Sequence, residues 1–228
     1  LKKHTKVRKK LRSLIHKYQD VFTISEESSV GHTDLMEAHL RVQPGTEPVM
    51  QKRRQFNPGL ERDLAAQVDK WLREGVVSPS ESPWSNPLVP VRKRDNTIRW
   101  AVDFRLLNKH IIKDSYRLPR IDHLINRCAG AQVYSSLDAS QAYFTIPLSA
   151  ESRAYTAFQT NEGLFEFNKL PFGISTAVSI YSRFIATVLN PLGSKGLSVY
   201  LDDILIFSSD MEGHLSRLEE VLAAHRKA

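Results

Sequence analysis

Two adjacent aspartates, Asp202 and Asp203, stand inside an apolar frame that runs from Leu197 to Phe207. Two carboxylates in such a place repel each other and lose part of their hydration, so their presence carries a cost. An ordinary Asp-Asp turn explains a change of direction, but an Asn-Gly pair suits a tight hairpin better. Hard divalent cations such as Mg²⁺ relieve the repulsion, because they prefer carboxylate oxygen and share their sites with substrate phosphates. The pair therefore indicates metal-dependent phosphate chemistry.

A third carboxylate, Asp138, ends another short apolar segment, Val133 to Leu137. Alone, such a residue is more often a strand-end cap than a ligand, but pairing of the two segments as neighbouring strands brings their ends together. Three carboxylates of this kind can hold two metal ions about 3.5–4 Å apart. Such ions lower the pKa of an attacking hydroxyl and stabilise a phosphorus-centred transition state. Asp138 is therefore the natural third ligand.

Helical and extended segments are mixed along the rest of the chain, so the elements that must position these carboxylates indicate an α+β fold. Asn57 is a good N-cap, Pro58 suits the first helical position and Gly75 suits the end, which predicts a helix between them. Ser209 and Glu212 form a capping-box pair, which predicts a last helix that reaches the end of the chain.

Apolar periodicity and turn residues predict the remaining elements. The second half of residues 1–17 and residues 180–189 have helical spacing. The expected extended segments are 39–42, 88–91, 98–102, 133–137, 144–148, a hairpin of 155–160 with 164–167 around Gly163, and a strand–turn–strand unit at 197–207.

Composition bounds the class of protein. The chain has 228 residues, of which 41% are hydrophobic and 25% charged, so it can bury a core and is not disordered throughout. One cysteine, Cys128, excludes an internal disulfide framework and a cysteine-based zinc site. No apolar run approaches the ~20 residues of a membrane helix. We expect a soluble protein from a reducing compartment with no membrane partner.

The net charge of +7 is unevenly distributed. Residues 1–17 hold eight Lys and Arg and no acid, and residues 18–40 hold five acids and no base. Residues 41–127 carry +7, whereas residues 128–228 carry −3. The basic middle favours a polyanionic partner such as nucleic acid. For the basic arm at residues 1–17 we favour a helix that docks locally and leaves its basic face solvated over a dedicated nucleic-acid arm.

Six segments together form a more specific pattern. They are Ser82–Pro87, Val102–Asn108, Leu118–Asp122, Ser136–Phe144, Leu170–Gly173 and Tyr200–Asp203. In order and spacing they resemble the fingers and palm of reverse transcriptases from gypsy-class long-terminal-repeat retroelements, in which Tyr-X-Asp-Asp is the catalytic box. The resemblance is clear from Pro44 to the end of the chain, and residues 18–42 look like the usual lead-in to that domain.

The resemblance implies a right-hand polymerase with fingers and an antiparallel palm sheet backed by helices, with the thumb absent. It implies a nucleotidyltransferase, an RNA-directed DNA polymerase that transfers nucleotides from dNTPs to a primer 3′-hydroxyl on an RNA or DNA template. Asp138, Asp202 and Asp203 would be the catalytic residues. They would bind two Mg²⁺ ions, for which Mn²⁺ can substitute, with help from the backbone carbonyl of Ala139.

The same resemblance implies nucleotide contacts. Arg99 matches the fingers arginine that contacts the incoming triphosphate, and either Lys93 or Arg94 matches its basic companion. Tyr143 matches the aromatic residue that rejects a ribose 2′-hydroxyl by steric clash, although outside the family context it would be a core aromatic. Phe172 is expected near the nucleotide base.

Further positions are expected near template and primer, namely Gly173, Tyr200 and Leu201. Arg105 and Asn108 are candidates for structural or template contacts, with the structural role preferred. The chain departs from the family at Thr176 and Val178, where Asn and Pro are usual, and at Gln141-Ala142, where Ser-Gly is usual. These departures leave the metal ligands intact and bear on template handling and fidelity.

Residues 1–43 are expected to form the basic arm and lead-in, and residues 44–228 the fingers–palm region, with the strongest match over 79–228. The chain reads as a fragment of a Pol polyprotein whose thumb, ribonuclease H and integrase lie elsewhere, so weak or absent processive synthesis is expected from it alone. Its partners would be an RNA or DNA template-primer, dNTPs and the rest of the polyprotein. The location would be intracellular, in a cytoplasmic virus-like particle if the element is active.

Two other functions compete. An RNA-dependent RNA polymerase shares the palm, but Tyr143 and the setting of Leu201 argue against it. A decayed or domesticated nucleic-acid-binding module without activity is the non-enzymatic alternative, and the intact Asp138, Asp202 and Asp203 argue against long decay.

Overall fold

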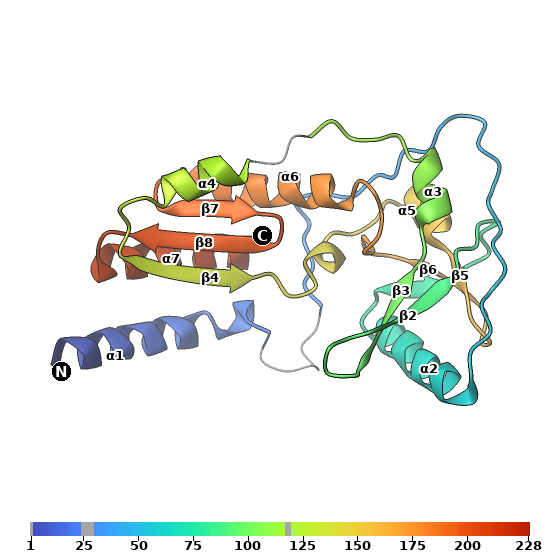
Figure 1. Cartoon of the computed structure of the whole chain (residues 1–228), viewed down its shortest axis with the longest axis horizontal. Helices are drawn as coiled ribbons and strands as arrows, with labels where there is room; N and C mark the ends of the chain where they lie inside the picture. Colours follow the sequence, from blue (N-terminus) through green and yellow to red (C-terminus); the bar gives the residue numbers. More distant parts are fainter. Residues whose placement is uncertain (1, 24–29, 117–119) are drawn as a thin grey trace. The chain divides into compact units, whose positions relative to one another are not determined.

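The computed structural model of the chain describes residues 2–23, 30–116 and 120–228 (Figure 1). They form two compact units that do not follow chain order. Unit 1 comprises Leu1–Ser29, Tyr116–Ala142 and Tyr181–Ala228, and unit 2 comprises Val30–Ser115 and Tyr143–Ile180. The expected boundary between residues 43 and 44 divides the sequence and stays a prediction. Within the described residues, no helix is both long and apolar enough to cross a bilayer.

The centre of unit 1 is a three-stranded antiparallel sheet of β4 (Val133–Asp138), β7 (Leu197–Tyr200) and β8 (Asp203–Ser208). β8 lies between the other two strands (Figure 1). Ile204 and Ile206 of β8 are buried on one face of the sheet, and Phe207 is buried on the other face near the far end of the strand. The expected strand at 133–137 and strand–turn–strand unit at 197–207 are confirmed.

The helices of unit 1 are α1 (Lys2–Lys17), α4 (Ile121–Arg127), α6 (Ala177–Leu189) from Tyr181 onward, and α7 (Met211–Lys227), with single 3₁₀ turns at Gln19–Val21 and Asn190–Leu192. α1 starts earlier than the predicted second half of residues 1–17. α7 packs against β8 and β4, and α1 packs against α7.

The expected capping box at Ser209 is wrong, because α7 is capped by Asp210. The Asp210 carboxylate accepts hydrogen bonds from the backbone N–H groups of Glu212 and Gly213 at 3.0 and 2.9 Å. These bonds lower the pKa of Asp210. A carboxylate satisfies the free N–H donors of a first helical turn and is also favoured by the helix dipole.

Unit 2 contains α2 (Pro58–Arg73), a hairpin of β2 (Leu88–Arg92) with β3 (Ile98–Val102), and a small sheet of β1 (Val77–Pro79), β6 (Leu164–Phe167) and β5 (Phe158–Gln159). Short helices lie at α3 (Arg105–His110) and α5 (Ala150–Arg153). Asn57 accepts from the N–H of Leu60 and Gly75 follows α2 with φ +65°, so both predicted ends of that helix are confirmed.

Three of the expected extended segments differ. Residues 144–148 begin inside a 3₁₀ turn (Ala142–Thr145), since the N–H of Ile146 donates to the carbonyl of Tyr143. The first arm of the hairpin shortens to Phe158–Gln159, because Ala154–Thr156 forms another 3₁₀ turn. Residues 39–42 make only isolated bridges, such as that of Val42 with Ile111. In residues 144–148, burial of alternate apolar side chains imitated a strand pattern.

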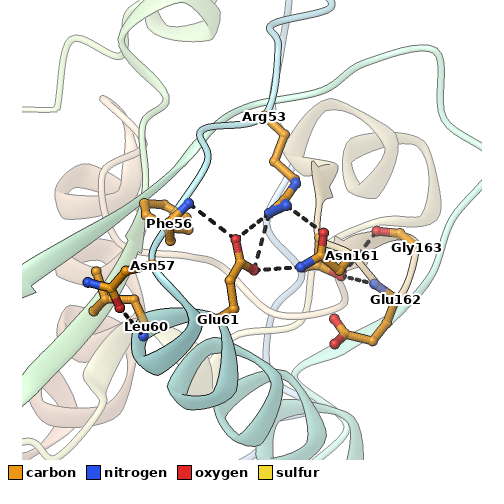
Figure 2. Close-up of polar contacts among 9 residues, drawn as sticks. Arg53, Phe56, Asn57, Leu60, Glu61, Asn161, Glu162 and Gly163 are labelled. Carbon is orange, nitrogen blue, oxygen red and sulfur yellow. Dashed lines mark hydrogen bonds and ion pairs between the residues drawn. The ribbon is translucent and has the colours of Figure 1, made fainter.

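A half-buried carboxylate, Glu61, joins three parts of unit 2 (Figure 2). Arg53, from the extended segment before α2, donates to both Glu61 oxygens at 2.9 and 3.2 Å. The N–H of Phe56 donates to Oε1, and the side-chain amide of Asn161, in the β5–β6 turn, donates to Oε2 at 2.8 Å. Arg53 also donates to Oδ1 of Asn161. Glu61 thus ties the first turn of α2 to a hairpin 100 residues away.

Replacement of Glu61 by Gln is expected to destabilise the chain by about 1–3 kcal/mol, because charge-assisted hydrogen bonds are the stronger ones. The amide has no charge and only one acceptor oxygen, so the donors on the other oxygen lose their acceptor and face an NH₂ group instead. Chemical denaturation with fluorescence detection measures the free energy of unfolding. The control is Glu162→Gln in the same hairpin turn, an exposed carboxylate, which is expected to change stability by less than about 0.5 kcal/mol. Equal effects in the two variants would contradict the role of Glu61.

Candidate active site

The pairing of β4 with β8 places two of the sequence-predicted carboxylates opposite each other. Asp138, the last residue of β4, is the cross-strand partner of Asp203, the first residue of β8. Directly opposed residues in antiparallel strands have Cα atoms about 4.5–5.5 Å apart. Tyr200 of β7 pairs with Asp203 from the other side. The structure therefore brings Asp138 and Asp203 onto one face of the sheet.

Asp202 stands in the two-residue turn between β7 and β8. Its backbone carbonyl accepts a hydrogen bond from the N–H of Ala139 at 3.3 Å, which ties the turn to the end of β4. Leu201, the other residue of the turn, has φ +57°. For a residue with a branched side chain this left-handed conformation costs about 1–2 kcal/mol. Such strain clusters at functional sites, where the surrounding structure holds it in place.

The three carboxylates have the donor chemistry that a hard divalent cation requires. Asp138 and Asp203 are exposed and Asp202 is half-buried. Over the described part of the chain, none of the three side chains forms a hydrogen bond or ion pair, so their oxygens are free for ligation. The described side chains include no gathered group of three or more His, Cys, Asp or Glu. The residues fit a metal site by register and donor type.

The covered face of the sheet supports the strand that carries Asp138. Ser135 of β4 is three residues earlier and points to the opposite face, because side chains alternate along a strand. Its hydroxyl is hydrogen-bonded to Nε2 of His214, a buried residue of α7, at 2.8 Å. Nδ1 of His214 is buried and has no partner among the described atoms. Burial lowers the pKa of His214, so the ring is held neutral.

In unit 2, three residues expected near the nucleotide form one cluster. The guanidinium of Arg99, from β3, lies over the ring of Phe172 at 4.2 Å from its centroid. The ring of Tyr143 meets Phe172 edge-on at 4.9 Å between centroids. Phe144, buried in the core, contacts the same ring at 5.5 Å. Phe172 therefore joins a cation to the aromatic core of the unit.

The expected basic companion residues lie at the tip of the β2–β3 hairpin. Lys93 and Arg94 are both exposed. Asp95 accepts hydrogen bonds from the N–H and the hydroxyl of Thr97, which lower its pKa and shape the turn, and Asn96 has φ +65°. The tip thus presents two cations to solvent, and the choice between Lys93 and Arg94 stays open.

Gly173 sits in a turn that is held by a side chain. With φ +93°, it has a conformation that other residues adopt only with strain. The amide of Asn108 donates to the Gly173 carbonyl at 2.7 Å and accepts from the N–H of Ser175 at 2.8 Å. Asn108 therefore has the structural role that was preferred from sequence. Arg105 likewise pairs with Asp103, at 2.7 Å between Nη2 and Oδ2.

Arg99, Trp100, Phe172 and Gly173 also line a cavity of about 310 Å³. Its other walls are mostly apolar and come from α2, β2, β3 and the core aromatics of unit 2. Two residues of the family pattern, Leu118 and Pro119, lie outside the described residues. Reasoning from sequence missed His214 and Ser135, because only the packing of α7 on β4 brings them together.

Comparison with known proteins gives one consistent result. Residues 91–228 match the family described as reverse transcriptase (RNA-dependent DNA polymerase). The Pol polyprotein from transposon opus of Drosophila melanogaster is 33% identical over 80% of this chain and 19% of the relative, and that from transposon gypsy is 30% identical over 95% and 21%. The chain thus spans about a fifth of the length of these relatives.

Solved structures agree on the fold. The foamy viral protease-reverse transcriptase in complex with RNA/DNA hybrid is similar with a TM-score of 0.88 and 24% identity, over 98% of this chain and 30% of that chain. The native prototype foamy virus protease-reverse transcriptase gives a TM-score of 0.84 and 25% identity, over 96% and 29%. The predicted α+β fold, with an antiparallel sheet backed by helices, is confirmed.

The neutral state of His214 makes the stability of the chain depend on pH. As the pH falls below the ordinary histidine pKa of about 6.5, His214 takes up a proton in the unfolded chain but stays neutral in the folded one. The free energy of unfolding therefore decreases until the pH reaches the lowered pKa of His214 in the folded state. His214→Gln keeps a polar partner for Ser135 but does not titrate. The variant is expected to lose less stability between pH 7 and pH 5 than the wild type, by up to about 1.4 kcal/mol per pH unit.

Urea denaturation at a series of pH values measures this difference. His225, whose pKa burial also lowers, remains in both proteins and cancels from the comparison. Parallel pH curves for the wild type and the variant would show that His214 is not the titrating group.

Proposed function

The chain belongs to the reverse transcriptase (RNA-dependent DNA polymerase) family, and from this membership we propose that it is the fingers–palm part of an RNA-directed DNA polymerase carried by a retroelement Pol polyprotein. The reaction is nucleotidyl transfer from a dNTP to the 3′-hydroxyl of a primer on an RNA or DNA template. The observation that carries the proposal is the register of Asp138 with Asp203, with Asp202 in the adjoining turn. A foamy viral relative of the same fold was solved in complex with RNA/DNA hybrid.

Asp138, Asp202 and Asp203 are proposed to hold two Mg²⁺ ions, together with the backbone carbonyl of Ala139. When bound, two such ions activate the primer hydroxyl and stabilise charge on the transferring phosphoryl group. The chain's own contribution is to hold these oxygens on one rigid sheet face, with the β7–β8 turn fixed against Ala139. A site built on paired strands keeps its ligands at constant spacing.

Unit 2 is proposed to bind the incoming nucleotide. Arg99, with Lys93 or Arg94 from the hairpin tip, neutralises the triphosphate by charge-assisted hydrogen bonds. To do so, Arg99 leaves the Phe172 ring on which it rests. Tyr143 excludes a ribose 2′-hydroxyl by the volume of its ring. Gly173, Tyr200 and Leu201 are proposed to lie along the template and primer. The proposed location is the cytoplasm, within a virus-like particle.

Asp202→Asn is expected to reduce Mg²⁺-dependent primer extension at least about a thousandfold in the full-length Pol polyprotein. The amide keeps the shape of the side chain but removes the negative charge that attracts the cation, and electrostatic stabilisation supplies most of the barrier reduction in phosphoryl transfer. Extension of a labelled DNA primer on an RNA template measures the rate. Asp210→Asn, which alters only the cap of α7, is the matched control and is expected to extend normally. A fully active Asp202→Asn protein would contradict the assignment of Asp202 as a catalytic residue.

Tyr143→Ala tests the choice of sugar, since removal of the ring opens space for a 2′-hydroxyl. The ratio of rNTP to dNTP incorporation is expected to rise at least about tenfold, because one steric clash is worth more than 1.4 kcal/mol. Single-nucleotide extension with dCTP or CTP gives kcat/KM for each. Phe144→Leu, a change of a neighbouring core aromatic, controls for general loosening. A wild-type preference for rNTPs would instead favour an RNA-dependent RNA polymerase.

A further inference from the structure

Helix α1 packs against α7 through one face. Leu14 and Tyr18 are buried, at 8% and 5% exposed. Lys10 pairs with Glu212 at 3.5 Å and Lys17 with Glu219 at 2.5 Å, and the bond to Glu219 raises the pKa of Lys17. These two ion pairs neutralise Lys10 and Lys17 of α1 with glutamates of α7.

Arg226, near the C-terminal end of α7, contacts residues that directly follow α1. It pairs with Asp20 at 2.5 Å, and its guanidinium lies 4.2 Å from the ring centroid of Tyr18. Tyr18 therefore lies against a cation of α7 while its ring is buried. α1 thus runs beside α7 in unit 1 as an integral helix (Figure 1).

Four further cations among the described side chains of α1 lie outside the face that contacts α7. Lys9 and Arg12 point away from the face that contains Leu14 and Tyr18, since successive helical residues turn by about 100°. By the same rotation, Lys6 and Arg8 lie on the two flanks of the helix, each about 100° from that face. Lys6, Arg8, Lys9 and Arg12 are exposed, and none of them pairs with an acid among the described residues. Six residues of helix rise about 9 Å, so these four unneutralised cations lie close together on the side and flanks of α1 that do not contact α7. We call these four residues the α1 basic stripe.

The position of the stripe separates it from the carboxylates. α7 covers the sheet face to which Ser135 points, where His214 contacts it. Asp138 points to the other face, because it is an odd number of residues from Ser135. The stripe therefore belongs with the helix layer of unit 1 and is no part of the proposed metal site.

Two polyanionic partners suit a basic amphipathic helix, and the packing decides between them. Binding to a membrane surface requires the apolar face to enter the lipid. In α1 that face is already buried against α7, so membrane binding would require undocking of the helix. A nucleic-acid backbone needs only the exposed cations, because duplex DNA presents one negative charge per about 1.7 Å of its length.

We propose that the α1 basic stripe is a second nucleic-acid contact surface, which binds the phosphate backbone of RNA or DNA without reading bases. The choice of nucleic acid rests on the proposed polymerase function, which brings template and primer to this chain. The stripe adds affinity through counterion release and holds strand that lies outside the polymerase cleft.

The test compares two double variants of the 228-residue chain that lose the same charge. Lys9→Gln/Arg12→Gln removes half of the stripe, whereas Lys195→Gln/Lys227→Gln removes two exposed cations elsewhere in unit 1. Glutamine is a good helix former, so α1 is retained, and circular dichroism checks this. Binding to labelled single-stranded RNA, single-stranded DNA and duplex DNA of mixed sequence is measured by anisotropy in EDTA from 50 to 300 mM salt.

The stripe variant is expected to bind all three probes at least about fivefold more weakly at low salt, with a log Kd against log salt slope lower by about 1.4 for single strands. The control variant is expected to change affinity less than twofold. Equal weakening of both variants, or of neither, would overturn the proposal. So would binding of the wild type to phosphatidylserine vesicles that is lost in the stripe variant while nucleic-acid affinity is unchanged.

This outcome is separable from that of the proposed function. Binding in EDTA needs neither metal nor dNTP, so it is measured independently of the polymerase reaction. If primer extension fails while the stripe variant binds nucleic acid weakly, the proposed polymerase function is refuted and the proposed contact surface stands. If primer extension succeeds while the stripe variant binds like the wild type, only the contact surface is refuted.

Discussion

The antiparallel pairing of β4 with β8 is the constraint on which the rest of unit 1 depends. Ile204 and Ile206 are buried against the helix side of the sheet, which sets the register by the apolar area removed from water. Asp138 and Asp203 then fall on the opposite face as direct partners, at the end of the sheet where both are exposed. A slip of one residue would turn every side chain of a strand over, so burial on one face determines whether the carboxylates meet on the other.

Like charges placed opposite each other oppose this pairing, and the fold compensates locally. The covered face of β4 gains a hydrogen bond from Ser135 to buried His214, and the strained turn at Leu201 is tied to Ala139 by the Asp202 carbonyl. On the opposite face, Asp138 and Asp203 keep exposed oxygens whose mutual repulsion a divalent cation would relieve.

What sequence could predict follows from how local each signal is. The ends of α2 were predicted because Asn57 and Gly75 act within a few residues of their positions. The cap of α7 was misassigned to Ser209, because both Ser209 and Asp210 suit a cap and only the backbone of Asp210 points its carboxylate at the first turn. The His214–Ser135 bond joins residues 79 apart and has no sequence pattern of its own. Which residues share a site was predictable from family spacing, whereas the contacts that hold them were not.

Phe172 shows how a site can be both anchored and adjustable. Its ring makes edge-on contacts with buried Phe144 and half-buried Tyr143, and the guanidinium of Arg99 lies over it. A cation–π contact at a partly exposed position is worth about 0.5–1 kcal/mol, less than a charge-assisted hydrogen bond to phosphate. Without a nucleotide, Arg99 is therefore held in a defined place by its contact with Phe172. That contact is weak enough to be exchanged for a hydrogen bond to phosphate. The turn that carries Phe172 stays in place when Arg99 moves, because the side chain of Asn108 is hydrogen-bonded to the backbone of Gly173 and Ser175.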